Sequence, residues 1–490
     1  MARFMSRSTV VDMLVEYFPS WLSSRQETIK LDAWLTGRQQ TLDEDPDDPM
    51  YGLPFAPRDE NTNAEYDNLR TLSPNAFAGL IVATLSQTAY VEGISRSGSA
   101  EAIGSWDTFR RNSWDAKQSQ IHRAAIGHGA AFGLVLPGVD PLTGDKAPRM
   151  IGKSAKKLAA FYDADDDEWP RFAIEAEPLT EDTTYARGVQ TGWTVRVYDD
   201  HVTHFLSCKG NGTDVDAWTY ISYEEHGTPV PPVARCVNRI DLDGVTTSEI
   251  EPVLPLLRRI DQTTFDRLVV QRFGAWQVRY IAGMAKPTSA NEAAIEKMRL
   301  RVEDILISTN ENTKFGTLQG SPLEPYTNVT DSDLRVLSAI TQTPPHHLLG
   351  LSSNLQAEAL AAAEAALQRK SFDFRTNAGE FHERMARLVA LQEGDMETAR
   401  AWDLRVRWRD TESRSMTQAA DALGKLAVQL KVPVEMLWEK IPGWTDTDVA
   451  RAKNLVEDGS FQRLIQELMD GADTADQNID QAAGSGGDEG

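Results

Sequence analysis

Apolar residues recur at intervals of three, four or seven positions along residues 355–392. Positions at these intervals share one face of an α-helix, so the spacing predicts one long amphipathic helix of roughly 57 Å. Ser353 and Gln356 fit a capping box at its start, and Asn377 and Gly379 weaken its middle, where we expect a bend. The apolar stripe consists of Leu360, Ala363, Leu367, Phe374, Ala378, Phe381, Met385 and Leu388.

A short helical pattern at residues 330–342 precedes this helix and is cut by Pro344 and Pro345. Two consecutive prolines fix the backbone at this point and favour a stiff loop. The loop carries no Lys or Arg between Thr343 and Asn354. The sequence therefore predicts a helix, a stiff loop and a long helix. In such an arrangement two rigid helices hold a narrow protruding loop in place.

Helical and strand-like patterns divide the N-terminal half of the chain. Helical spacing covers residues 1–40 and 68–132, whereas β-branched and aromatic residues bounded by Gly, Asn and Asp predict short strands over 150–245. A helix resumes near Ser248, which fits a capping box with Glu251.

The other segments are shorter. Residues 276–329 combine a strand-like, a helix-like and a turn-rich piece, which predicts a small α+β insert. Apolar and charged residues alternate over 402–409, as in a strand, with Trp402 on the apolar side. Residues 411–470 predict three amphipathic helices, and the acidic, Gly-rich residues 471–490 predict disorder. The fold class is therefore α+β and mainly helical.

Length and charge limit the class of protein. A chain of 490 residues can hold two to four domains, and its net charge of −23 argues against a protein that grips DNA through phosphate contacts. An acidic wall along which DNA slides is still compatible with this charge. Neither a signal peptide nor an apolar run of about 20 residues is evident, and two cysteines suggest a reducing compartment. We expect no membrane association.

Several short motifs resemble chemical sites without matching them. The GKSAKK segment at Gly152 lacks the earlier glycine of a phosphate loop, and GHGAAFG has the wrong spacing for dinucleotide binding. The acidic run that begins at Asp163 lacks the glycine and the final glutamate of a calcium loop. His204 and Cys208 lie in a strand-like stretch with His201, without a fourth ligand nearby for zinc. We expect no cofactor.

His346 and His347 follow the two prolines directly. They indicate either an exposed loop or a loop that lines something. Because adjacent side chains diverge, we expect no metal site there. No serine elbow, zinc-protease motif or pair of catalytic carboxylates is recognisable, so catalytic residues are not expected.

The order of these elements resembles the portal proteins of tailed bacteriophages, of the SPP1 portal type, over roughly residues 10–470. Three segments contribute most to the resemblance: WDTFRRNSWDAKQSQIHRAAIGHGAAF, PVARCVNRIDLDGVTTSEIEPVLPLLRRIDQTTFDRLVV, and TQTPPHHLLG with the Ala- and Glu-rich segment after it.

The resemblance implies a multidomain subunit of wing, stem, clip and crown. It assigns residues 1–245 to the wing, 246–275 and 330–342 to stem helices, 276–329 to the clip, 343–354 to a tunnel loop, 355–392 to a long kinked wing helix, 393–410 to a wing strand and 411–470 to crown helices. The implied tunnel-loop residues are Thr343, Pro344, Pro345, His346, His347, Leu348, Leu349, Gly350, Leu351, Ser352, Ser353 and Asn354.

The family resemblance also implies partners and location. It implies a ring, usually of twelve copies, at one vertex of the virion head, assembled in the host cytoplasm. Double-stranded DNA would pass through the ring without sequence-specific contacts during packaging and ejection. The terminase large subunit, a head-completion or adaptor protein, and the major capsid and scaffolding proteins would be its partners. A capsid or adaptor protein without a channel, and a metal-dependent hydrolase with an unrecognised acidic site, are the alternatives.

Overall fold

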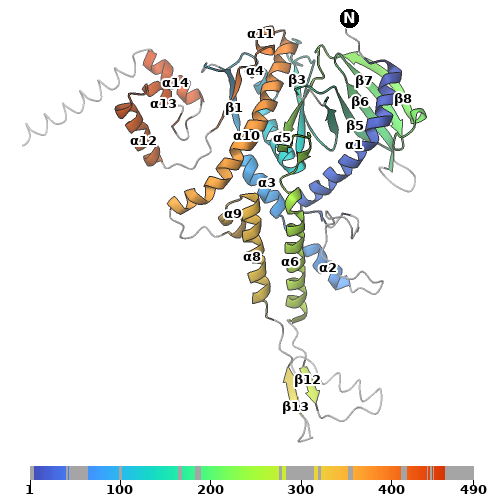
Figure 1. Cartoon of the computed structure of the whole chain (residues 1–490), viewed down its shortest axis with the longest axis vertical. Coiled ribbons are helices and arrows are strands. Elements are labelled where there is room, and N and C mark those ends of the chain that lie inside the picture. The colour runs from blue at the N-terminus through green and yellow to red at the C-terminus, as the bar shows by residue number, and fades with distance from the viewer. Residues whose placement is uncertain are drawn as a thin grey trace, which may run out of the picture. The chain divides into compact units, whose positions relative to one another are not determined.

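The computed structural model describes residues 5–39, 42, 64–98, 102–163, 168–181, 189–274, 279–282, 314–317, 322–350, 357–409, 416–438, 440–441, 444 and 446–457. The chain divides into two compact units. The larger contains residues 1–89 and 94–406, and the smaller contains residues 90–93 and 407–490. Figure 1 labels the elements in chain order.

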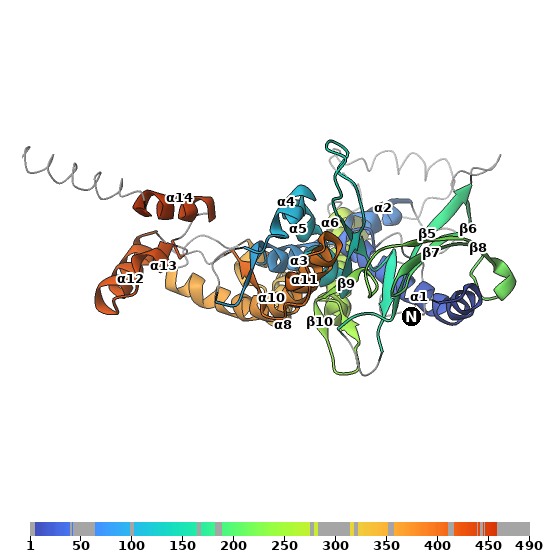
Figure 2. The ribbon, with the colours of Figure 1, turned by 90° about the horizontal axis from the view of Figure 1, so that it is seen from above.

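A five-stranded antiparallel sheet forms the first layer of the larger unit. Its strand order is β4-β5-β6-β7-β8, so each strand pairs with its neighbour in sequence. Helix α1 packs along one face, where Phe18 and Trp21 meet Trp193 and Trp218 in an apolar core (Figure 2). The bounds are α1 Arg7–Leu35, β4 Leu158–Phe161, β5 Phe172–Glu181, β6 Val189–Tyr198, β7 Val202–Lys209 and β8 Trp218–Glu225.

The larger unit also contains a three-stranded sheet of order β3-β2-β9. Central strand β2 (Ala130–Leu136) pairs antiparallel with β3 (Arg149–Ser154) and β9 (Val233–Val237). The prediction of helix through residue 132 was therefore wrong. Gly129, at φ +88°, ends the preceding helix, and the apolar run after it is buried as a strand.

Helices α3 (Phe77–Gln87) and α4 (Trp106–Arg111) pack on α5 (Trp114–His128), which contacts β2, β3 and β9 of this sheet. Helix α2 (Ala64–Leu72) lies beside α6 (Leu254–Gly274) instead (Figure 1). Between α3 and α4, residues Val91–Arg96 form strand β1, which pairs with β14 (Leu404–Trp408). The sequence did not predict β1, because its partner lies more than three hundred residues away in the chain.

Two helices of the larger unit, α6 (Leu254–Gly274) and α8 (Glu324–Thr341), pack against each other. The capping box predicted at Ser248 is not formed. The Ser248 hydroxyl donates to the Gly127 carbonyl at 2.7 Å, and a 3₁₀ turn, Glu251–Val253, precedes α6. Before it, β10 (Arg239–Ile240) pairs with β11 (Thr246–Thr247).

The insert between α6 and α8 contains an antiparallel pair of strands, β12 (Arg279–Ala282) and β13 (Lys314–Thr317). The first lies within the predicted strand, whereas the second occupies a segment predicted as turns. The helix expected within this insert lies outside the described residues. Helix α8 begins at Glu324, earlier than the predicted residue 330.

Helix α10 (Ala357–Glu393) confirms the long helix predicted from the apolar stripe, and helical structure continues through Asn377 and Gly379. Its stripe from Leu367 to Leu388 is buried and packs on β2 and β9. The side chains of Leu360 and Ala363 are not described, and the proposed cap at Ser353 and Gln356 lies outside the described residues.

The chain continues through α11 (Met396–Ala399) into β14. Trp402 lies before this strand and is 90% exposed, so its predicted place on the apolar side was wrong. The smaller unit contains helices at the three predicted places, α12 (Met416–Gln429), α13 (Val434–Trp438) and α14 (Asp446–Glu457), and the rest of the third predicted helix, residues 458–470, lies outside the described residues. The acidic tail at residues 471–490 lies outside the described residues. Among the helices that the structure describes, none combines the length and apolarity needed to span a bilayer.

Candidate functional site

The candidate site is the connection between α8 and α10, which comprises residues 342–356. The structure describes it as far as Gly350, so Leu351, Ser352, Ser353 and Asn354 lie outside the described residues. The predicted loop is partly wrong, because residues Pro345–Leu349 form the short helix α9.

Proline and glycine define this short helix. Pro345 occupies its first turn, where a missing N–H costs nothing. Gly350 ends it in the left-handed conformation, at φ +66°, and its N–H donates to the His346 carbonyl at 3.1 Å. Leu348 is buried, which anchors one side of α9.

Hydroxyl groups fix the chain where α8 ends. The Ser338 hydroxyl donates to the Thr343 carbonyl at 2.6 Å, and the hydroxyls of Thr341 and Thr343 lie 3.0 Å apart. Both threonines are buried, and Gln342 between them is left-handed at φ +53°. The entry into the connection is therefore held by side-chain hydrogen bonds as well as by the prolines.

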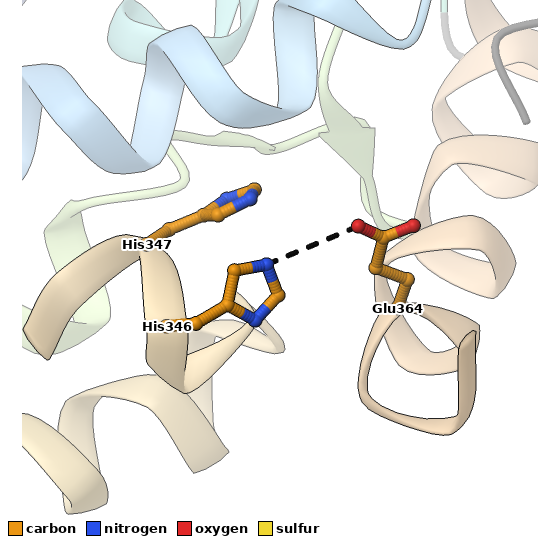
Figure 3. Close-up of side chains that lie close together, drawn as sticks. All are labelled: His346, His347 and Glu364. Atoms are coloured by element: carbon orange, nitrogen blue, oxygen red, sulfur yellow. Dashed lines mark ion pairs between the residues drawn. The ribbon is translucent and has the colours of Figure 1, made fainter. Parts of the chain in front are cut away.

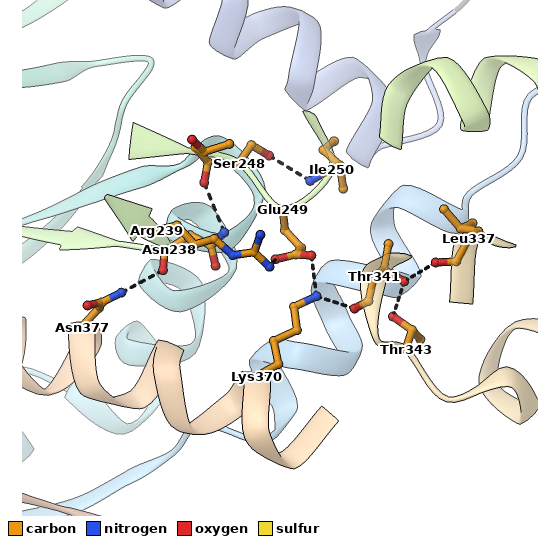
Figure 4. Close-up of polar contacts among 11 residues, drawn as sticks. Asn238, Arg239, Ser248, Glu249, Ile250, Leu337, Thr341, Thr343, Lys370 and Asn377 are labelled. Atoms are coloured by element: carbon orange, nitrogen blue, oxygen red, sulfur yellow. Dashed lines mark hydrogen bonds and ion pairs between the residues drawn. The ribbon is translucent and has the colours of Figure 1, made fainter. Parts of the chain in front are cut away.

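A buried lysine joins three segments at this point, as Figure 4 shows. The Lys370 ammonium on α10 donates to the Glu249 carboxylate and to the carbonyl of Thr341 at the end of α8. The lysine and glutamate side chains are only 6% and 3% exposed, and Arg239 also contacts Glu249 at 3.2 Å. Burial lowers the pKa of Lys370 from its usual value, while the carboxylate of Glu249 opposes that shift.

This lysine was missed in the sequence reasoning. Lys370 lies three residues after Leu367 and four before Phe374, so it falls on the predicted apolar stripe. A charged residue on a buried face requires a partner of opposite charge, which is the signal that could have identified it. The partner, Glu249, lies far away in sequence and could not be identified from spacing.

A second ion pair joins the two stem-like helices. The Arg259 guanidinium of α6 donates to both oxygens of the Asp333 carboxylate of α8, at 3.0 and 2.6 Å. Such bidentate pairs fix orientation as well as distance. Asp333 is buried, whereas the arginine side chain is 58% exposed, so solvent weakens this interaction.

His346 and His347 do not diverge as expected. Their ring centroids lie 4.4 Å apart, and Figure 3 shows both rings beside Glu364 of α10. Nε2 of His346 lies 3.9 Å from the Glu364 carboxylate. One ligand atom from each of the three residues lies within 4.8 Å of the others. Burial and the neighbouring His346 lower the pKa of His347 from its usual value.

The connection therefore lies between the α6–α8 helix pair and the long helix α10. The elements follow one another along the chain in the order α6, β12, β13, α8, α9 and α10. The family model described as "Phage portal protein, SPP1 Gp6-like" matches residues 19–460. The chain belongs to the phage portal protein family. Portal proteins are structural components of the virion, and this portal protein therefore has a structural role there.

Among solved structures, this portal protein resembles a chain described as "Neck of native GTA particle computed with C12 symmetry". The two share 11% sequence identity with a TM-score of 0.43, and the match covers 80% of this chain and 95% of that chain. No curated protein matches the portal protein significantly.

The near-miss motifs of the sequence occupy structural positions in the portal protein. Gly152 lies within strand β3, where it packs on Ile121 of α5. Both ring nitrogens of His204 are engaged, with Asp199 at 3.0 Å and with the Tyr220 hydroxyl at 2.8 Å. Each of these two residues therefore takes part in packing or hydrogen bonding within the fold.

Proposed function

We propose that this portal protein assembles into a closed ring of twelve copies at one vertex of the virion head. The ring would surround a channel for double-stranded DNA during packaging and ejection. Family membership over residues 19–460 supports this proposal, and the structure adds an observation about the surface of α8.

Helix α8 carries two apolar faces. Leu334 and Leu337 belong to the buried face, where α8 packs within its own chain. Val329, Val336 and Ile340 are separated by seven and four residues, so they form a second stripe on one side of the helix. These three side chains are 49%, 44% and 56% exposed.

This second stripe is the observation that carries the proposal. An exposed apolar stripe on a rigid helix is a surface suited to association. Because these side chains are exposed in the single chain, a neighbour could cover them without disturbing the fold. Repeated around a rotation axis, such a head-to-tail contact closes a ring.

The charge of the connection suits a channel wall. Residues 343–354 contain neither Lys nor Arg, and the chain carries a net charge of −23. DNA affinity depends on cations that neutralise phosphates, so a wall without them lets the duplex move. In the ring, residues 343–354 would face the DNA, between the stem helices α6 and α8 and the long helix α10.

The insert between α6 and α8 provides the docking region in this proposal. Within residues 276–329, the described part consists of the β12–β13 pair and the beginning of α8. We propose that this region binds the terminase large subunit during packaging and a head-completion or adaptor protein afterwards. The major capsid and scaffolding proteins would surround the ring, which forms in the host cytoplasm before it joins the head.

The assembly is tested by mass and shape. Twelve copies of 54.3 kDa give about 650 kDa, which mass photometry separates from a monomer or dimer. Negative-stain images should show a ring with a central hole. A ring without a hole would support the alternative of a capsid or adaptor protein without a channel.

Substitutions on α8 test the stripe itself. Val336→Glu and Ile340→Glu should each reduce the ring fraction at fixed protein concentration, because a charge would be buried between copies. Asn328→Glu is the matched control. The substitution adds the same charge to α8, and Asn328 is exposed but lies off the stripe. Equal assembly of all three variants would rule out the stripe as the contact.

A further inference from the structure

We propose that His346, His347 and Glu364 form a site for a divalent transition-metal ion, of which Zn²⁺ is the model. The ion would link α9 to α10 and so fasten the connection to the long helix. The proposal goes beyond the ring, and the site would exist in a single chain.

The donor set suits this class of ion. Two imidazole nitrogens and one carboxylate oxygen are ligands that Zn²⁺ uses in sites with three protein ligands and a water. Mg²⁺ and Ca²⁺ prefer oxygen ligands, so they should bind poorly here. Co²⁺ and Ni²⁺ share the preference for imidazole and serve as probes.

The three groups converge without satisfying one another. The separation of 3.9 Å between Nε2 of His346 and the Glu364 carboxylate is too long for a hydrogen bond. Figure 3 shows that Nε2 is the ring nitrogen of His346 that points toward Glu364, whereas Nδ1 points away from it. Nε2 of His346, the His347 ring and the Glu364 carboxylate therefore lie together without a hydrogen bond between His346 and Glu364, and they can accept a ligand.

The three groups lie within a short approach of a metal geometry. Tetrahedral bonds of about 2.0–2.2 Å place ligand atoms roughly 3.3 Å apart. The present ligand atoms lie within 4.8 Å of one another, so they must approach by up to roughly 1.5 Å. Glu364 is partly exposed and His347 is exposed, which leaves both free to rotate.

The position of the site gives it a consequence. A bound ion would close the chain between α9 and Glu364, across residues 351–356. Closing a loop restricts the conformations of the chain within it. The metal would therefore hold α9 against α10, next to the residues that face the DNA in the proposed ring.

The test uses the full chain, stripped of metal with a chelator. Titration with ZnCl₂ in a calorimeter should show one high-affinity ion per chain. CoCl₂ should give the visible absorption of cobalt in a low-symmetry nitrogen and oxygen site. His347→Ala and Glu364→Gln should each weaken Zn²⁺ binding by at least about tenfold, since even outer-shell partners of metal ligands contribute about 10–100-fold.

Two matched controls should leave binding unchanged. His201→Ala removes a histidine elsewhere, and Glu380→Gln removes an exposed carboxylate on the same helix, α10. His347 is exposed, so its substitution tests the site without loss of the core. Binding of Zn²⁺ that is equal in His347→Ala, Glu364→Gln and the controls would overturn the proposal, as would the absence of stoichiometric binding in the unsubstituted chain. Neither result would bear on ring assembly, which is measured by mass.

Discussion

Lys370→Met removes the cation that joins α10 to the end of α8 and to the segment before α6. Methionine keeps the length and most of the volume of the lysine side chain, so packing changes little. The carboxylate of Glu249, 3% exposed, loses its buried ionic partner, and the Thr341 carbonyl loses a donor. The substitution therefore isolates the electrostatic role of the residue.

The expected loss of stability depends on the partners that Glu249 keeps after the substitution. Breaking a buried ion pair by removing one partner costs about 3–5 kcal/mol, because the other charge is left uncompensated. Arg239 stays 3.2 Å from Glu249, but its side chain is 56% exposed and replaces only part of the interaction. We therefore expect a loss near the lower limit, about 3 kcal/mol in the free energy of unfolding of the larger unit.

A double-mutant cycle provides the assay. Glu249→Met combined with Lys370→Met removes both charges, so the double variant should be more stable than Lys370→Met alone. Denaturant unfolding followed by tryptophan fluorescence gives the free energies at one protein concentration. Hydrogen exchange of residues 338–350 should rise in Lys370→Met, because the end of α8 is no longer held.

Two results would refute this reasoning. The first is a loss below about 1 kcal/mol in Lys370→Met, which is the range of an exposed ion pair. The second is an additive cycle, because contacting partners must show an interaction energy. Either would mean that Lys370 does not fasten the connection to its support.

Three further predictions concern other parts of the chain. Burial lowers the pKa of His122 to about 4, so as the pH falls from 6.5 to 4 the unfolded chain binds the extra proton and the free energy of unfolding decreases, by up to about 3 kcal/mol. Nε2 of His382 lies 2.9 Å from Nε2 of His122, and burial lowers the pKa of His382 as well, so His382 contributes in the same direction; the difference in unfolding free energy between pH 7 and 4.5 should therefore shrink in His122→Gln and be retained in part. Gly133→Ala would place a Cβ 2.6 Å from the sulfur of Met385 and cost about 1–3 kcal/mol in unfolding, whereas Gly379→Ala, with open space around its Cβ position, should be neutral or stabilising. Ser353→Lys adds a phosphate-binding charge to the proposed channel and should slow packaging of DNA in a salt-sensitive way, and unchanged packaging would count against a DNA-facing connection.

Local periodicity predicted those elements that are stabilised by neighbouring residues. The stripe of α10 gave its position because a long helix makes its hydrogen bonds within itself, and its packing face repeats every few residues. Runs of β-branched and aromatic residues bounded by turn residues likewise predicted the β-rich region. Local patterns failed at β1 and β2, because a strand is completed by partners far away in sequence, and an apolar run such as AAFGLVL fits a buried helix equally well.

The candidate connection shows the same division. The two prolines predicted a stiff entry, and the ordered series of segments indicated the portal family, which the family match confirmed. The sequence could not place Lys370 beside Glu249, because a charge on a buried face indicates that a partner exists but not which residue it is. Nor could it bring Glu364 to His346 and His347. The chain itself determined its helices, its strand-rich region and its family; tertiary packing decided which charges and imidazoles meet, because those contacts depend on the mutual position of elements that no local spacing encodes.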